Sequence, residues 1–414
     1  MTAAEGAFGQ RIIDMAARLA EWSDTPDGLS CTYLTPSHRA VAAELQRWMA
    51  TAGMSVTIDA VGNVIGRYAA ADPAARALIV GSHYDTVLNA GNYDGRLGIL
   101  VGLLAFEHLS RTGIKLPFHL DLIGFAEEEG VRFGVPYIGS SAIAGRFDRR
   151  VLQRSDATGQ SVADLIHKTG FDPDNLGGLA RRPEDLLGYL EVHIEQGPVL
   201  LQEGLPVGVV TGIAGNIRYA VTITGTAGHA GTVPMTMRRD AAAAAAEIVL
   251  FVERRCSAAP TLVGTVGRLS VPHGAINVVP GRCDLSIDIR AGDDATRDAA
   301  VSDVLAEIER IGRRRGVKCE VTEVQRGPAV PCSPAMQARF AAAIERAGVN
   351  PRYLPSGAGH DAVMFSGLTD VGMLFVRCGN GGISHSPLET IVAADADMAT
   401  RILVDTIVNF ERPS

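Results

Sequence analysis

Side chains of the types that bind divalent metal ions follow several apolar, strand-like runs of this 414-residue chain. Each comes after such a run or heads the helix behind one: His83, Asp94, Glu128, His193 and His385. Histidines and carboxylates without any cysteine suit Zn²⁺, Mn²⁺ or Co²⁺. Because a spare carboxylate beside such ions can act as a base in metal-assisted hydrolysis, the pattern predicts a hydrolytic enzyme.

Two local groups extend this set. Asp85 lies two residues after His83, where it could accept the ring N–H of that histidine and fix its tautomer, or could be a plain turn residue. The consecutive glutamates 127–129 could supply one ligand and one free base, but the residues alone leave the register open. Taken singly, a histidine after a strand is more often structural and a glutamate run is more often solvated. The joint placement favours the metal site.

Alternating apolar strands and helices must position these side chains. Strands are predicted over 54–60, 64–69, 77–80, 118–126 and 373–376, with helices beginning near residues 36 and 94. Such alternation is typical of an α/β layered fold with a mostly parallel central sheet. Ligands bind beyond the carboxyl ends of strands in such sheets, so separate segments deliver metal-type side chains to one edge.

The pattern changes from about Gly212. Strands are predicted over 217–226, 261–270, 282–290 and 317–324, and helices over 238–255 and 294–315. This βαββαβ order is typical of an open-faced sandwich with two helices on a four-stranded sheet. We therefore expect a discontinuous catalytic domain, residues 1–212 and 329–414, with a smaller domain inserted at 213–328. Glycines near 212–215 and at 327 could be hinges or plain linker residues.

Composition narrows the classes of partner. The net charge of −8 gives no basic footprint for nucleic acid or an anionic membrane surface. No run approaches the roughly 20 apolar residues of a membrane span, and the first residues have no apolar signal-peptide core. The six cysteines are scattered without a CxxC pair, which suggests reduced thiols. We expect a cytoplasmic protein with no nucleic-acid or membrane partner.

Longer motifs identify a family. GSHYDTV, GNYDGRLGI, EEEGVRF, HIEQGPVL, GHAGTVPMTMRRDA, INVVPG, SGAGHDA and GISHSP occur in this order between Gly81 and Pro387. The chain resembles the N-carbamoyl-L-amino acid amidohydrolase family, which includes allantoate amidohydrolases and β-ureidopropionases within the aminoacylase/carboxypeptidase superfamily of binuclear metallohydrolases. The resemblance implies a zinc-peptidase-like catalytic domain, an inserted lid and dimerisation domain, and a homodimer. It also implies two divalent ions per subunit, Zn²⁺, Mn²⁺ or Co²⁺.

The same resemblance implies roles for the metal-type residues. Asp94 would bridge the two ions. His83 and His193 would hold one of them, and Glu128 and His385 would hold the other.

It likewise implies that Glu127 is the general base acting on a metal-bridging hydroxide, and that Glu129 lies outside the site. His229 would stabilise the developing oxyanion. The substrate-binding residues would be Gln196, Asn277, Arg290 and His360. Without the resemblance, His229 would be interpreted as a loop histidine and Arg290 as a surface charge. The remaining three would be interpreted as turn or capping residues.

The implied activity is hydrolysis of the ureido (N-carbamoyl) group of a small carboxylic acid, an N-carbamoyl-L-amino acid or allantoate, releasing ammonia and CO₂. A dipeptidase or N-acyl-amino acid deacylase of the same superfamily is the alternative enzyme. A non-catalytic metal-dependent binding protein is the alternative of another class. The sequence does not identify which ureido acid is the substrate or which metal is bound.

Overall fold

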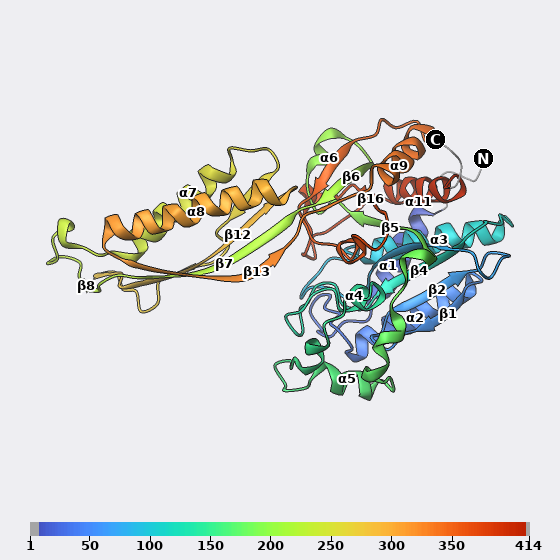
Figure 1. Cartoon of the computed structure of the whole chain (residues 1–414), viewed down its shortest axis with the longest axis horizontal. Helices are drawn as coiled ribbons and strands as arrows, with labels where there is room; N and C mark the ends of the chain where they lie inside the picture. Colours follow the sequence, from blue (N-terminus) through green and yellow to red (C-terminus); the bar gives the residue numbers. More distant parts are fainter. Residues whose placement is uncertain (1–7, 411–414) are drawn as a thin grey trace. The chain divides into compact units, whose positions relative to one another are not determined.

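The computed structural model describes residues 8–410, and the chain forms two compact units (Figure 1). The first contains the chain up to Thr211, Cys332–Leu354 and the part from His360 onward, and the second contains Gly212–Pro331 and Pro355–Gly359. The outermost seven and four residues of the predicted catalytic segments lie outside the described residues. The roles of the units as catalytic domain and lid remain predictions.

The first unit is organised on a mixed sheet. Its strands are β1 (Ser55–Ile58), β2 (Val64–Tyr68), β3 (Ala77–His83), β4 (His119–Phe125), β5 (Leu186–Ile194), β6 (Val207–Ile213) and β16 (Val371–Val376). They follow one another in the order β1-β2-β4-β3-β5-β16-β6. β4, β3, β5 and β16 run parallel, while β2 and β6 join them antiparallel. The predicted α/β class with a mostly parallel central sheet is confirmed. The antiparallel strands on either side of the parallel ones were not part of that prediction.

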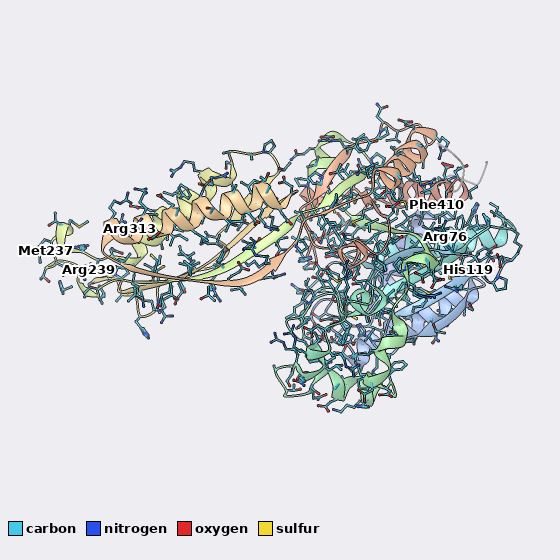
Figure 2. All side chains as sticks on the ribbon, in the orientation of Figure 1. Arg76, His119, Met237, Arg239, Arg313 and Phe410 are labelled. Atoms are coloured by element: carbon cyan, nitrogen blue, oxygen red, sulfur yellow. The ribbon has the colours of Figure 1, made fainter. Side chains whose placement is uncertain are left out.

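Helices shield the parallel strands from water. The longer ones are α1 (Gly9–Ala20), α2 (Pro36–Thr51), α3 (Arg96–Arg111), α9 (Pro334–Arg346) and α11 (Ala393–Val408). α3 packs on β3, β4 and β5 and is itself covered by α1 and α11. Every residue of β3, β4 and β16 is buried, as expected for strands covered on both faces. Phe410, labelled in Figure 2, closes the core against Phe118, with ring centroids 5.7 Å apart.

The second unit has two helices on one face of an antiparallel sheet (Figure 1). Its sheet contains β7 (Gly215–Thr224), β9 (Leu262–Thr265), β10 (Leu269–Ser270), β12 (Arg282–Ala291) and β13 (Lys318–Gly327). Burial alternates along β7 and β12, because only one face lies under α7 (Ala241–Cys256) and α8 (Asp294–Arg315). The single strand predicted over 261–270 is instead two short strands, both paired with β12, with Gly267 between them.

Beyond this sheet, β8 (Gly228–His229) and β11 (Val278–Val279) form a separate two-stranded ladder. Met237 and Arg239, labelled in Figure 2, lie in the segment between β8 and α7. Within residues 8–410, no helix combines the length and apolar character needed to cross a membrane.

Candidate metal centre

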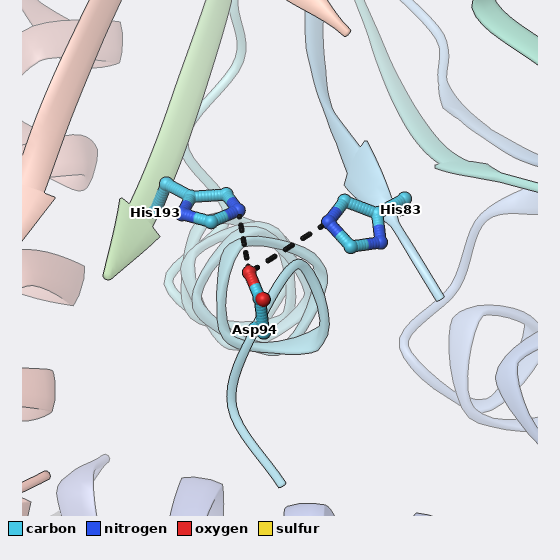
Figure 3. A group of neighbouring side chains, drawn as sticks. All are labelled: His83, Asp94 and His193. Carbon is cyan, nitrogen blue, oxygen red and sulfur yellow. Dashed lines mark ion pairs between the residues drawn. The ribbon is translucent and has the colours of Figure 1, made fainter. Parts of the chain in front are cut away.

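Two neighbouring parallel strands end in histidines. His83 is the last residue of β3, and His193 is the residue before the end of β5. Asp94 comes just before Gly95, which takes a φ of 67° as it starts α3. Oδ1 of Asp94 lies 3.2 Å from Nε2 of His193 and 3.9 Å from Nε2 of His83 (Figure 3). The carboxyl edge of the sheet therefore brings these three buried side chains together.

The hydrogen bonds around the rings indicate which nitrogen carries the proton. Nδ1 of His83 lies 3.1 Å from the carbonyl oxygen of Asp85, and Nδ1 of His193 lies 2.9 Å from that of Ile194. Each Nδ1 must therefore donate, which leaves Nε2 as an acceptor. The Gly95 N–H also donates to Nε2 of His193 over 3.3 Å. Two imidazole lone pairs and a carboxylate oxygen thus face one another.

The pKa values of the two histidine rings shift in opposite directions. Burial lowers the pKa of His193 to about 4, although Asp94 opposes the shift. Burial also disfavours the charged form of His83, but the hydrogen bond to Asp85 and the surrounding carboxylates outweigh it and hold the pKa of His83 well above its usual range. The carboxylates that favour a proton on His83 make this buried site negative, and a cation between the two Nε2 atoms would balance that charge. The donor set therefore fits a divalent metal ion.

A second group gathers around the other oxygen of Asp94. Its Oδ2 lies 2.9 Å from Nε2 of His385, and Oε1 of Glu129 lies 3.4 Å from the same nitrogen. His385 takes a left-handed φ of 54° in the loop after β16. One carboxylate therefore stands between two clusters of metal-type side chains, with one oxygen toward each.

The glutamate run has a definite register. Both carboxylate oxygens of Asp85 accept backbone N–H groups, from Glu128 at 3.0 Å and from Glu129 at 3.2 Å. Ligand atoms of Glu128 and Glu129 come within 4.8 Å of each other and of His83. The expectation that Glu129 lies outside the site is wrong, because this turn brings it to His385.

The first glutamate of the run, Glu127, differs from the other two. It is fully buried and belongs to none of the metal-type groups formed by residues 8–410. Burial, and then the negative charges of Asp85 and Glu129, raise the pKa of Glu127 well above its usual range. The structure thus does not bring Glu127 to the clusters around Asp94.

Comparison with known proteins gives the family. The model of peptidase family M20/M25/M40 matches residues 79–409. The chain is 38% identical to the N-carbamoyl-L-amino acid amidohydrolase of Geobacillus stearothermophilus over 96% of its own length and 98% of that protein. It is 40% identical to allantoate deiminase 2 of Glycine max, over 97% and 90% respectively. A crystal structure of a hydantoinase/carbamoylase family amidase from Burkholderia multivorans superimposes with a TM-score of 0.90, at 32% identity and 97% coverage of both chains.

The chain belongs to peptidase family M20/M25/M40. The resemblance to N-carbamoyl-L-amino acid and allantoate amidohydrolases is confirmed at the level of sequence. Family membership and the His/Asp/Glu clusters are together compatible with divalent metal binding.

In this M20 chain two predicted substrate residues lie at the clusters. Nε2 of Gln196 is 3.2 Å from each carboxylate oxygen of Asp94. The buried ring of His360 meets that of His193 edge-on, with centroids 4.4 Å apart. Glu191 joins these two histidines in a further buried group. Sequence reasoning missed Glu191, although its position two residues before His193 on one strand places both on the same face.

The other three predicted residues belong to the second unit. His229 on β8 is opposite Val278 of β11, and the N–H of Ala230 donates to the carbonyl of Asn277 at 2.9 Å, so His229 and Asn277 are neighbours. Arg290 lies near the carboxyl end of β12, whereas β11 and Asn277 precede its first residue. The guanidinium of Arg290 donates two hydrogen bonds of 2.9 Å to Asp288 and one of 2.8 Å to the carbonyl of Gly357. The second unit does not bring Arg290 together with the other two.

Proposed function

We propose that this chain hydrolyses the ureido group of a small carboxylic acid, an N-carbamoyl-L-amino acid or allantoate, and releases ammonia and CO₂. Relatives that align along nearly the whole chain carry these activities in their names. The observation that carries the proposal is the position of Asp94, whose two carboxylate oxygens face different clusters of metal-type side chains. That arrangement suits two divalent cations sharing one carboxylate.

His83 and His193 would hold one cation, and His385 with Glu129 would hold the other, with Asp94 common to both. When bound, such cations polarise the carbonyl group of a substrate and lower the pKa of water toward about 7. Zn²⁺, Mn²⁺ and Co²⁺ all suit the donor set, since it contains only imidazole and carboxylate groups.

Glu128 then replaces Glu127 as the proposed general base. Its neighbour Glu129 lies at His385, whereas Glu127 is buried outside the clusters. The Glu128 carboxylate takes a proton from the attacking water, whose oxygen forms the new bond to the carbamoyl carbon. The same carboxyl group returns the proton to the leaving nitrogen as the carbon–nitrogen bond breaks. The carbamate that remains then loses CO₂.

The substrate acid needs a cationic partner, for which Arg290 remains the candidate. Its bonds to Asp288 and Gly357 hold the planar guanidinium in one orientation, which favours recognition of a carboxylate. His229 and Asn277 remain candidates for hydrogen bonding to the developing oxyanion. Gln196 and His360 would complete the pocket beside Asp94 and His193. The homodimer belongs to the same proposal, and light scattering in solution tests it.

An ammonia-release assay tests the proposed activity. Metal-depleted protein is reloaded with Mn²⁺ and given allantoate, several N-carbamoyl-L-amino acids and 3-ureidopropionate, with dipeptides and N-acetyl-amino acids as matched controls. Metal-dependent ammonia release from at least one ureido acid is expected. Turnover of dipeptides or acyl-amino acids alone would reject the proposal in favour of a peptidase or deacylase. Tight Mn²⁺ binding without turnover of any substrate would favour a binding protein.

A further inference from the structure

A buried carboxylate joins the two loops that carry Asp94 and His385. Glu389 is only 4% exposed. Its Oε1 accepts the backbone N–H of Tyr93 at 2.7 Å and of Asp94 at 3.2 Å. Its Oε2 accepts the hydroxyl of Ser384 at 3.3 Å. One side chain thus fixes the backbone at Asp94 and also the residue that precedes His385.

The same small network sets the rotation of the Asp94 carboxylate. The Ser384 hydroxyl lies 3.4 Å from Asp94 Oδ2. The amide nitrogen of Gln196 lies 3.2 Å from both carboxylate oxygens, and 3.3 Å from both Ser384 Oγ and His385 Nε2. With its backbone and its carboxylate both held, Asp94 directs Oδ2 at His385 over 2.9 Å.

Close packing gives Glu389 little freedom. A Cβ atom placed on Gly91 would lie 2.3 Å from the Cβ and 2.4 Å from Oε1 of Glu389, so the loop before Asp94 rests directly on this side chain. The N–H of Glu389 also donates to the carbonyl of Ser386 at 3.0 Å, which closes the turn after His385. His385 itself has a left-handed φ. This backbone conformation costs free energy, and it persists only where surrounding bonds enforce it.

We propose that Glu389 is a positioning residue that aligns Asp94 and His385 for one shared cation. This inference rests on the metal assignment of the proposed function. Partners that orient metal ligands through hydrogen bonds typically contribute about 10- to 100-fold to metal affinity. A residue that only stabilised the turn would change the unfolding temperature and leave metal affinity unchanged. The two readouts therefore separate positioning from plain structural support.

The test compares Glu389→Ala, Glu389→Gln and a control in the full-length, metal-depleted protein. Mn²⁺ is titrated against a competing chromophoric chelator, and thermal unfolding is recorded without metal. The control is Asp397→Asn, since Asp397 is also a buried carboxylate that accepts a backbone N–H, that of Phe8 at 3.0 Å. It also accepts a hydrogen bond from Arg401, and both of these partners lie outside the loops that carry Asp94 and His385. The control should lower the unfolding temperature and leave Mn²⁺ affinity within about twofold.

Glu389→Ala should weaken one Mn²⁺ site by about 10- to 100-fold. Glu389→Gln should lose less, because its amide oxygen still accepts from Tyr93 and Asp94. Parental Mn²⁺ affinity in Glu389→Ala, with a lowered unfolding temperature, would overturn the positioning role and leave the proposed function standing. Failure of the parent protein to bind Mn²⁺ would overturn both. If Glu389→Ala does not fold, unchanged affinity in both Glu389→Gln and Ser384→Ala would overturn the role.

Discussion

Three single substitutions in the glutamate run test which residue is the general base, which is a metal ligand and which is neither. Glu128→Gln keeps the shape of the side chain and removes its ability to take a proton. General-base removal typically costs 10²- to 10⁴-fold in rate, or about 3–5 kcal/mol of transition-state stabilisation. Because Glu128 is proposed as the base and not as a ligand, the variant should bind metal normally while kcat/KM for ammonia release falls by that factor.

Glu129→Gln should behave differently. Glu129 is the carboxylate beside His385, with Oε1 3.4 Å from Nε2, so its loss should remove one of two bound ions as well as activity. Glu127→Gln should be close to neutral. Burial and nearby carboxylates raise the pKa of Glu127 well above its usual range, which favours the protonated carboxyl group, and glutamine is close in shape to that form. Glu127 also lies outside the metal-type groups formed by the described residues.

Steady-state ammonia release and elemental analysis of bound metal check all three variants under one set of conditions. A large loss of kcat/KM in Glu127→Gln with metal content intact would refute the register deduced from the structure. It would restore Glu127 as the base. Full activity of Glu128→Gln would refute the mechanism itself.

Three further changes have direct outcomes. Asp94→Asn should lower metal affinity at both sites by more than about tenfold, because Asp94 faces both clusters, and elemental analysis checks this. Gly95→Ala should lower metal content and activity, since a Cβ there would lie 2.4 Å from the His83 ring at a φ of 67°; activity after metal reloading measures it. Burial lowers the pKa of His38 to about 4 from about 6.5, so the unfolded state binds more protons and stability falls as pH drops through this window. His38→Gln should remove about 2 kcal/mol of the loss between pH 7 and 5, measured by urea unfolding of metal-free protein.

Much of the first cluster could be predicted from sequence. His83 and His193 each follow an apolar run, and adjacent parallel strands end at one edge. The sequence also predicts Asp94 at the head of the following helix, and in the structure it directly precedes Gly95, where α3 begins. These positions depend only on strand direction and on short connections.

The glutamate register depends on a contact distant in sequence. Asp85 binds the N–H groups of Glu128 and Glu129 from another strand end, and this contact decides which carboxylate reaches His385. Glu389 lies much farther still from Tyr93 along the chain. The sequence predicts β2 as the strand over 64–69 but not its antiparallel direction, because the apolar residues of a strand do not record its direction; β6 is not among the predicted strands. Local pattern thus predicted the elements, and long-range hydrogen bonds decided the roles.

The second unit raises the question of which subunit completes a site. His229 and Asn277 lie at the ladder before β12 begins, whereas Arg290 lies near its other end, about 25 Å away for eight extended residues. A ureido acid is far shorter than this strand, so all three cannot contact one substrate from one protomer. In the proposed homodimer, the partner would supply one end.

A mixing experiment tests that reasoning. Glu128→Gln lacks the proposed base and His229→Ala lacks the proposed oxyanion donor, so each homodimer should be inactive. If His229 acts across the interface, a mixed dimer pairs the intact Glu128 of one protomer with the intact His229 of the other. Random exchange at equal concentrations should then restore about a quarter of parental activity, since half the dimers are mixed and each has one complete site. Mixtures that form heterodimers and stay inactive would show that His229 acts within its own protomer, and that Arg290 must then be the residue contributed in trans.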